Sequence, residues 1–143
     1  MIKFRHAFLA IAAVLAVHVF AIGTGVYQSM DWFDIPMHFF GGYAIAFLAL
    51  ATYNWIFSQI SISTRSTTSS PYARLLLQGV FVMGFVMIVG VAWEWYEFLF
   101  DQFATTMVAK YGFAQMGLPD TMDDLLNDTL GAMTAWYLWR EKS

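Results

Sequence analysis

The chain contains no cysteine, which excludes disulfide bonds and metal sites built on thiolates. Charged residues are also scarce: they make up 12% of the 143 residues, about half of their usual share in a soluble domain. The seven lysines and arginines form no basic cluster, so we expect no nucleic-acid partner. These deficits argue against a disulfide-stabilised secreted protein, an ordinary soluble domain and a nucleic-acid-binding protein.

Long hydrophobic runs dominate the chain instead. Hydrophobic residues make up 59% of the sequence, its mean hydropathy is +0.58, and a helix needs about 20 residues to cross a bilayer. We predict a single all-α integral membrane domain, residues 1–143. The four expected transmembrane helices cover residues 7–27, 35–57, 73–103 and 121–140. The last is the weakest, because its apolar part, from Leu130 to Trp139, is too short to span without the acidic segment before it.

The N-terminus has a second interpretation as a secretory signal peptide, because Lys3 and Arg5 precede an apolar stretch. That stretch, from Ala7 to Gly23, is long for a signal peptide, and no A-x-A cleavage site ends it. We therefore expect a retained first helix.

The basic residues predict the topology, since lysine and arginine concentrate in cytoplasmic loops. Six of the seven would lie on one side of a four-helix protein, and Lys110 alone on the other. The six are Lys3, Arg5, Arg65, Arg74, Arg140 and Lys142. We expect both termini in the cytoplasm.

Nine of the ten acidic residues would lie towards the extracytoplasmic side. Residues three or four apart share a helix face, and this spacing relates Glu94, Glu97 and Asp101, then Asp34 and His38, then Asp120, Asp124 and Asp128. Alternate helices run in opposite directions, so the start of the second, the end of the third and the start of the fourth lie at one level. The sequence predicts an acidic polar site at the extracytoplasmic end of the bundle.

Helix capping explains only part of this pattern. It suits Asp34, Asp120 and a capping box that includes Asp123, but Glu94 and Glu97 stand near a helix C-terminus, where the helix dipole disfavours anions. An ionised acid within a membrane helix costs about 2.5–3.5 kcal/mol on insertion scales. Such acids are protonated, face a water-filled cavity or bind a cation.

Of these alternatives we favour a divalent metal ion, because carboxylates and one imidazole without sulfur suit Mg²⁺, Mn²⁺, Fe²⁺ or Zn²⁺. We assign Glu94 as a candidate general base for a metal-bound water. The candidate ligands are His38, Glu97, Asp101, Asp124 and Asp128. The remaining polar residues expected at the site are Asp34, Asp120, Asp123 and Asn127.

This site favours a metal-dependent membrane hydrolase acting on a lipid or lipid-linked substrate. The alternatives are a cation- or proton-binding protein related to transport, and a structural scaffold without catalysis. A transport pathway needs polar groups through the full depth of the membrane. In the cytoplasmic halves of the last three predicted helices, however, the main polar side chains are Thr52, Asn54 and Gln78.

Other residues carry weaker predictions. His18 is expected to make a hydrogen bond between helices. Tyr27, Trp93 and Trp95 are expected in the aromatic belt at the outer membrane surface. The segment SQISISTRSTTSSPYAR is predicted to be a flexible linker, and ATTMVAKYGFAQMGLP a short helix or a cap over the outer ends. Glycines are expected where helices pack closely: Gly41, Gly42, Gly84, Gly90 and Gly131.

Three motifs, DIPMH followed by GG, WEWYEF and DDLLNDTLGA, resemble those of VanZ-like membrane proteins and of a related uncharacterised bacterial inner-membrane family. The resemblance covers about residues 31 to 133 and implies a multi-pass protein of the bacterial inner membrane. VanZ-like proteins are associated with low-level glycopeptide resistance. Asp128 stands where their pattern often has Asn, and the arginine common before their last acidic element is absent here, so the chain is closer to the uncharacterised family. The positions that match the motifs are Asp34, His38, Glu94, Glu97, Asp124, Asp128 and Gly131.

Overall fold

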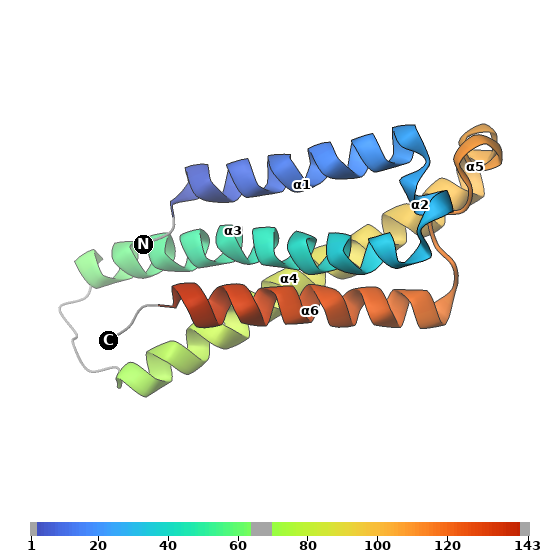
Figure 1. Cartoon of the computed structure of the whole chain (residues 1–143). Helices are drawn as coiled ribbons and strands as arrows, with labels where there is room; N and C mark the ends of the chain where they lie inside the picture. The colour runs from blue at the N-terminus through green and yellow to red at the C-terminus, as the bar shows by residue number, and fades with distance from the viewer. Residues whose placement is uncertain (1–2, 64–69, 141–143) are drawn as a thin grey trace.

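The computed structural model describes residues 3–63 and 70–140, and all regular structure in these ranges is helical. Four long helices run alternately up and down (Figure 1). They are α1 (Phe4–Thr24), α3 (Asp34–Ser63), α4 (Pro71–Phe103) and α6 (Leu118–Trp139). The short helices α2 (Val26–Ser29), η1 (Asp31–Phe33) and α5 (Thr105–Tyr111) lie together at one end of the bundle (Figure 1).

Several predicted boundaries shift in the structure, including the start of α1, at Phe4, and the start of α6, at Leu118. Helix α1 ends at Thr24 rather than at residue 27, because Gly25 adopts a left-handed backbone (φ +73°) and its N–H caps carbonyls of the last turn. Helix α3 continues through Ser63, so the first part of the expected linker is helical. Helix α4 already begins at Pro71, which suits the first turn of a helix. The end of the expected linker, from Pro71 to Arg74, is thus helical as well, and its residues 64–69, which include Arg65, lie outside the described residues.

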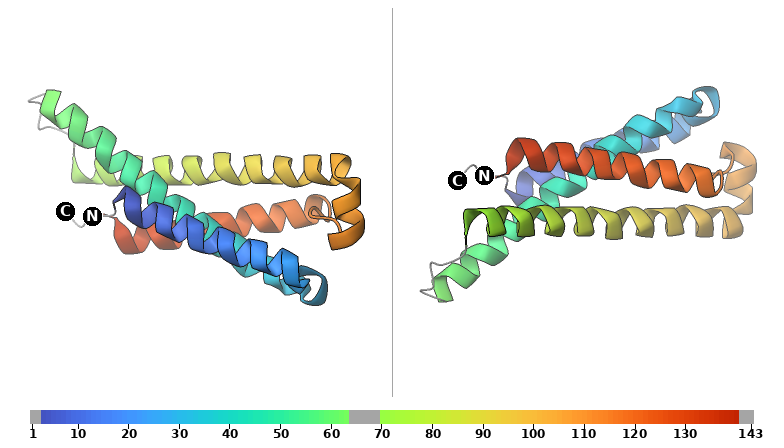
Figure 2. Two further views of the ribbon diagram at one scale, coloured as in Figure 1. Left: turned by 90° about the horizontal axis from the view of Figure 1, so that it is seen from above. Right: turned by 90° about the horizontal axis from the view of Figure 1, so that it is seen from below.

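Helix α3 is the centre of the bundle: it packs against α6, α1 and α4, and α4 also packs against α6. It crosses α4 and α6 obliquely, whereas α1 runs nearly alongside it (Figure 2). Two glycines let α3 and α6 approach closely. A Cβ atom on Gly42 would collide with the backbone carbonyl oxygen of Asp128, and one on Gly131 with that of Phe39. The prediction for Gly84 is wrong, since a Cβ atom there would meet no neighbouring atom within 4 Å and the residue faces outwards.

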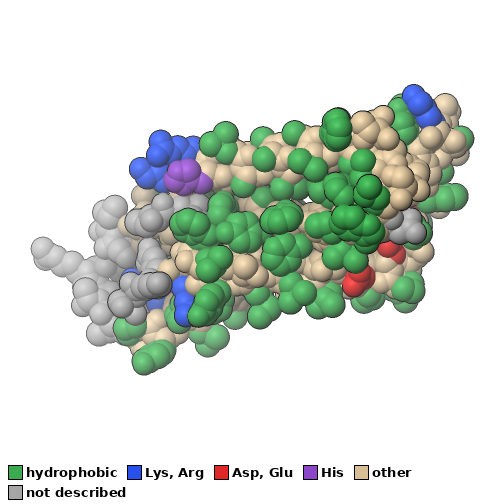
Figure 3. Space-filling model, in the orientation of Figure 1, with side chains coloured by type: hydrophobic (Ala, Val, Ile, Leu, Met, Phe, Trp, Pro, Cys, Tyr) green, Lys and Arg blue, Asp and Glu red, His purple; other side chains and the backbone are tan. Residues whose placement is uncertain are grey.

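Small and branched apolar residues fill the space between the helices, among them Ala46, Leu50, Val82 and Ala132. Within the described ranges, three helices are long and apolar enough to cross a membrane: Phe4–Thr24, Asp34–Ile60 and Pro71–Phe103. Large apolar side chains cover much of the lateral surface (Figure 3).

The outward face of α6 is also largely apolar, although its acidic residues lower its overall hydropathy. Its two best-buried acids, Asp124 and Asp128, point into the bundle. The exposed large residues recur at intervals of three or four for most of its length: Leu118, Met122, Leu126, Leu130, Met133 and Tyr137.

Candidate functional site

Five ionisable side chains from three helices meet in the half of the bundle next to α2 and α5. His38 comes from α3, Glu94 and Glu97 from α4, and Asp124 and Asp128 from α6. Each is between 2% and 7% exposed. Since buried charges need partners, the contacts within this group decide what the site can do.

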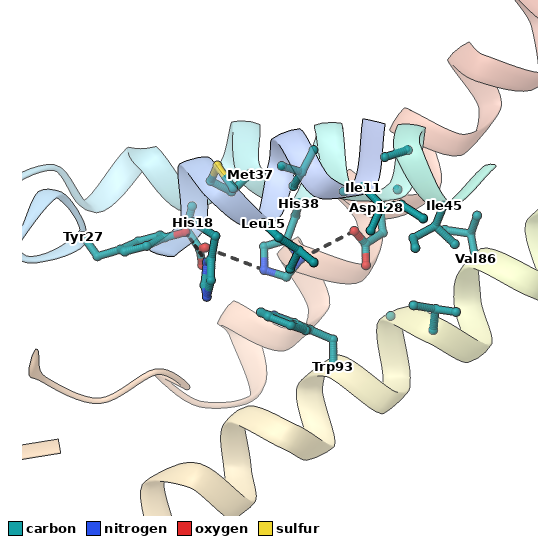
Figure 4. A pocket seen from close by; sticks show the side chains of 17 residues that line it. Ile11, Leu15, His18, Tyr27, Met37, His38, Ile45, Val86, Trp93 and Asp128 are labelled. Carbon is teal, nitrogen blue, oxygen red and sulfur yellow. Dashed lines mark hydrogen bonds and ion pairs between the residues drawn. The ribbon is translucent and has the colours of Figure 1, made fainter. Parts of the chain in front are cut away.

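His38 lies between carboxylates on both sides of its ring. Its Nε2 is 3.5 Å from Asp124 Oδ1 and 3.7 Å from Asp34 Oδ1, and its Nδ1 is 3.6 Å from Asp128 Oδ1 (Figure 4). Whichever nitrogen carries the proton, an acceptor lies in front of it. The imidazole is therefore oriented from both ends, as in carboxylate–histidine pairs that move protons or hold metals.

Glu94, Glu97 and Asp124 form a second group beside this histidine. One carboxylate oxygen of each residue lies within 4.8 Å of a carboxylate oxygen of each of the other two. Asp34, His38 and Asp124 meet the same criterion, so Asp124 belongs to both groups. Three acids at this separation repel one another unless a proton or a cation lies between them.

Several carboxylate oxygens of this second group have no hydrogen-bond partner. Both oxygens of Glu94, Oε2 of Glu97 and Oδ2 of Asp124 are buried without one. The other oxygen of Glu97 accepts a hydrogen bond of 2.9 Å from the indole N–H of Trp93. Buried polar groups are almost always paired, so the unpartnered oxygens indicate a site for a bound proton or cation.

Basic side chains offer no alternative partner in the described part of the chain. The ion pairs of the clustered acids there all involve His38. Lysine and arginine gather near the end where α1 starts and α6 ends, with one basic side chain at the opposite end (Figure 3). Oxygen ligands with one adjacent imidazole fit a hard or borderline divalent cation.

Other predicted site residues have local roles instead. Asp101 accepts backbone N–H groups of Ala114 and Gln115, each at 2.9 Å, and so fixes the loop between α5 and α6. Asp120 accepts the N–H of Met116 at 2.9 Å.

Asn127 and Asp123 likewise lie apart from the two groups. The side-chain amide of Asn127 donates to the Asp123 carbonyl at 2.8 Å, and the Asp123 side chain is exposed. The structure thus brings Asp34, His38, Glu94, Glu97, Asp124 and Asp128 together, and leaves Asp101, Asp120, Asp123 and Asn127 outside the groups.

A cavity of about 130 Å³ opens beside His38, between α1, α3 and α4. His18 and Tyr27 line it, and the Nδ1 of His18 and the Tyr27 hydroxyl share a hydrogen bond of 2.8 Å (Figure 4). Burial, reinforced by Asp34 and Glu97, raises the pKa of the Tyr27 phenol, so it keeps its proton at neutral pH. The hydrogen-bond partner of His18, Tyr27, lies on α2, just beyond the end of α1, and not on another long helix as predicted.

The family comparison agrees with the apolar helices. The sequence model of DUF2238, a family described as a predicted membrane protein, matches residues 3–142. The chain belongs to the DUF2238 family. No curated protein and no solved structure matches it. A relation to VanZ-like proteins is not shown, so that resemblance stays a likeness of motifs.

In this DUF2238 protein the sequence pattern misses two contributors to the site. The sequence predicts Trp93 in the aromatic belt, but it is half-buried, binds Glu97 and packs edge-on against His18 with ring centres 5.2 Å apart. It also predicts Tyr27 at the membrane surface, with no role in the site. The i, i+4 spacing of Trp93 and Glu97 is the available signal for the first, since it places both on one helix face.

Proposed function

We propose that Glu94, Glu97 and Asp124 bind a divalent cation within the membrane domain, and that the protein is a hydrolase acting on a lipid or lipid-linked substrate. The unpartnered, buried carboxylate oxygens of these three residues carry the proposal. A cation would neutralise the acids and make their joint burial favourable. Without one, each ionised acid costs several kcal/mol in the interior.

The residues around the cation divide the work of hydrolysis. A divalent cation supplies the Lewis acidity that activates water at neutral pH. His38 is the best-placed general base, because Asp128 faces its Nδ1 while its Nε2 points towards Asp124, which belongs to the cation group. Glu94, the base favoured from the sequence, is the alternative, since both of its oxygens are free of hydrogen bonds. Trp93 orients Glu97 through the indole N–H.

We further propose four transmembrane helices, with both termini in the cytoplasm of a bacterium and the site near the extracytoplasmic surface of the inner membrane. The 22 residues of α6 give a helix of about 33 Å, long enough to span. Its two best-buried acids, Asp124 and Asp128, point inwards, and its exposed face carries Leu118, Leu126 and Met133. The grouping of basic side chains at the opposite end supports the orientation (Figure 3).

A transport function has less support, because the polar groups do not continue through the bundle. In the other half, Leu50, Val82 and Val86 are fully or almost fully buried. The polar pair described there, Gln78 and Asn54, is joined by a side-chain hydrogen bond of 3.4 Å.

Cation binding can be measured directly by titrating the chelator-treated protein with Mn²⁺ in detergent and following free Mn²⁺ by electron paramagnetic resonance. We expect saturable binding to the wild type and at least tenfold weaker binding to Asp124→Asn, since this residue belongs to both groups. Asp123→Asn is the matched control, because Asp123 is exposed on the same helix.

Two results would overturn the cation site: no saturable binding to the wild type, or equal binding to wild type and Asp124→Asn. For the hydrolase, the wild type should release water-soluble head groups from a bacterial lipid extract only when a divalent cation is present. Release that persists unchanged in chelator, or in the His38→Gln and Glu94→Gln variants, would contradict the proposed roles.

A further inference from the structure

The cavity beside His38 changes in polarity along the helix axes. Three of its polar lining residues, His18, Tyr27 and Asp34, are at the end where α1 finishes and α3 starts. Its apolar lining, including Ile11 and Val86, lies deeper in the bundle. From Ile11 to His18 the α1 wall covers about 10 Å. The polar end thus lies near the membrane surface and the apolar end points towards the membrane centre, the orientation of a lipid in the adjacent leaflet.

The position of α1 gives a lipid a way in. Helix α1 packs mainly against α3 and has few contacts with α4. Across this seam, His18 meets Trp93 edge-on at the polar end of the cavity. Below that contact, the cavity wall is formed by short apolar side chains such as Val14 and Val89, which an acyl chain can pack against.

We propose that this cavity binds the substrate as an uncharged lipid, with a hydroxyl- or ester-bearing head group at His18 and Tyr27 and a hydrocarbon chain along α1 and α4. The inference rests on the proposed function, and it names the substrate class of that site. A protonated phenol and an imidazole can donate to a carbonyl oxygen or accept from a hydroxyl group. The acids Asp34 and Asp128 also line the cavity, and its lining contains no lysine or arginine from the described part of the chain, so an anionic head group is disfavoured.

The same cavity places the lipid head group next to the chemistry. His38 and Asp128 line it, and His38 also faces Asp124 of the cation group at 3.5 Å. A bond in the head group is thus close to the base and to the cation ligands. Tyr27 and His18 have no part in holding the cation, so substituting them should weaken lipid binding and leave cation affinity unchanged.

The experiment uses the full-length protein in phosphatidylcholine nanodiscs and a monoacylglycerol with a diazirine in its acyl chain. After photolysis, the labelled residues are identified by mass spectrometry. We expect labels on the cavity-facing residues of α1 and α4. Labelling should fall about two- to tenfold in Tyr27→Phe, which removes one hydrogen-bonding group, and further in Leu15→Trp, which fills the cavity.

Each variant has a matched control. Tyr72→Phe changes an exposed tyrosine at the other end of the bundle, and Leu9→Trp makes the same substitution on the exposed face of α1. If the two controls and the two cavity variants label alike, the lipid site is refuted. Stronger labelling by the lysophosphatidylglycerol with the same chain would refute the uncharged head group.

Measuring Mn²⁺ binding on the same samples separates this inference from the proposed function. Normal Mn²⁺ binding without cavity labelling overturns the lipid site and leaves the cation site standing. Cavity labelling without Mn²⁺ binding supports the lipid site and overturns the proposed cation chemistry.

Discussion

Replacing Glu94 by Gln tests why a buried carboxylate with no hydrogen bond is present at all. Both of its oxygens are unpartnered, so the substitution breaks no hydrogen bond of the protein and keeps the side chain's size. In chelator we expect the variant to be as stable as the wild type or more stable, by at most about 3 kcal/mol, the cost of an ionised acid at such a depth.

With a divalent cation the wild type should instead be more stable than Glu94→Gln. At a free concentration a hundred times Kd, binding to the native state alone adds about 2.7 kcal/mol, which for a chain of this size raises Tm by roughly 10 °C. Glu94→Gln should lose most of this gain, because it removes the charge of one of the three carboxylates. The exposed Asp123→Asn should keep it in full.

The assay is a melting curve in detergent for each protein, in chelator and with Mg²⁺, Mn²⁺ or Zn²⁺. An equal cation-dependent rise in wild type and Glu94→Gln would refute the reasoning, and so would a wild type that no divalent ion stabilises. Unfolding of Glu94→Gln in chelator would show that the carboxylate is structural, which would remove the main reason for a cation site.

Three further variants test the surroundings of the site. Trp93→Phe keeps a ring against His18 but removes the N–H that Glu97 accepts, so Mn²⁺ affinity should fall about tenfold in titrations while the melting point in chelator changes little. Asp101→Asn should speed hydrogen exchange in residues 112–117, which its carboxylate fixes, and leave Mn²⁺ affinity unchanged; a loss of affinity would restore it as a ligand. Gly42→Ala should lower the free energy of unfolding by more than about 1 kcal/mol, and with it the melting point, because the new Cβ meets the opposing backbone of α6. Gly84→Ala has open space around the new Cβ and should leave the melting point unchanged.

Helical spacing and alternating direction are sufficient to predict which residues share a level. Hydrophobic length predicts the long helices, and the i, i+4 spacing of Asp34 and His38, and of Asp124 and Asp128, places them on common faces. The structure brings these faces together because α3 and α6 pack most closely, at Gly42 and Gly131.

Spacing cannot show how each helix is rotated or where a loop folds back. Asp101 continues the stripe of Glu94 and Glu97, but it lies in the last turn of α4, and the loop after α5 returns to supply its two N–H donors. The bond between His18 and Tyr27 depends on the left-handed turn at Gly25. Both contacts join segments whose relative positions depend on turns, which periodicity does not describe.

Helix α6 shows why a buried polar site makes the helix that contributes to it harder to recognise by hydropathy. A helix that contributes acids to a buried polar site must turn them inwards, and the same acids lower its hydropathy. What remains detectable is an apolar stripe on the exposed face, and in α6 this includes Leu118, Leu126 and Met133. The inward stripe, with Asp124 and Asp128, requires neighbours that tolerate carboxylates. In this bundle His38 lies beside both aspartates, whereas the two glutamates of α4 add negative charge and unpartnered oxygens beside Asp124. This is the reason for proposing a cation, which would allow all of these acids to be buried together.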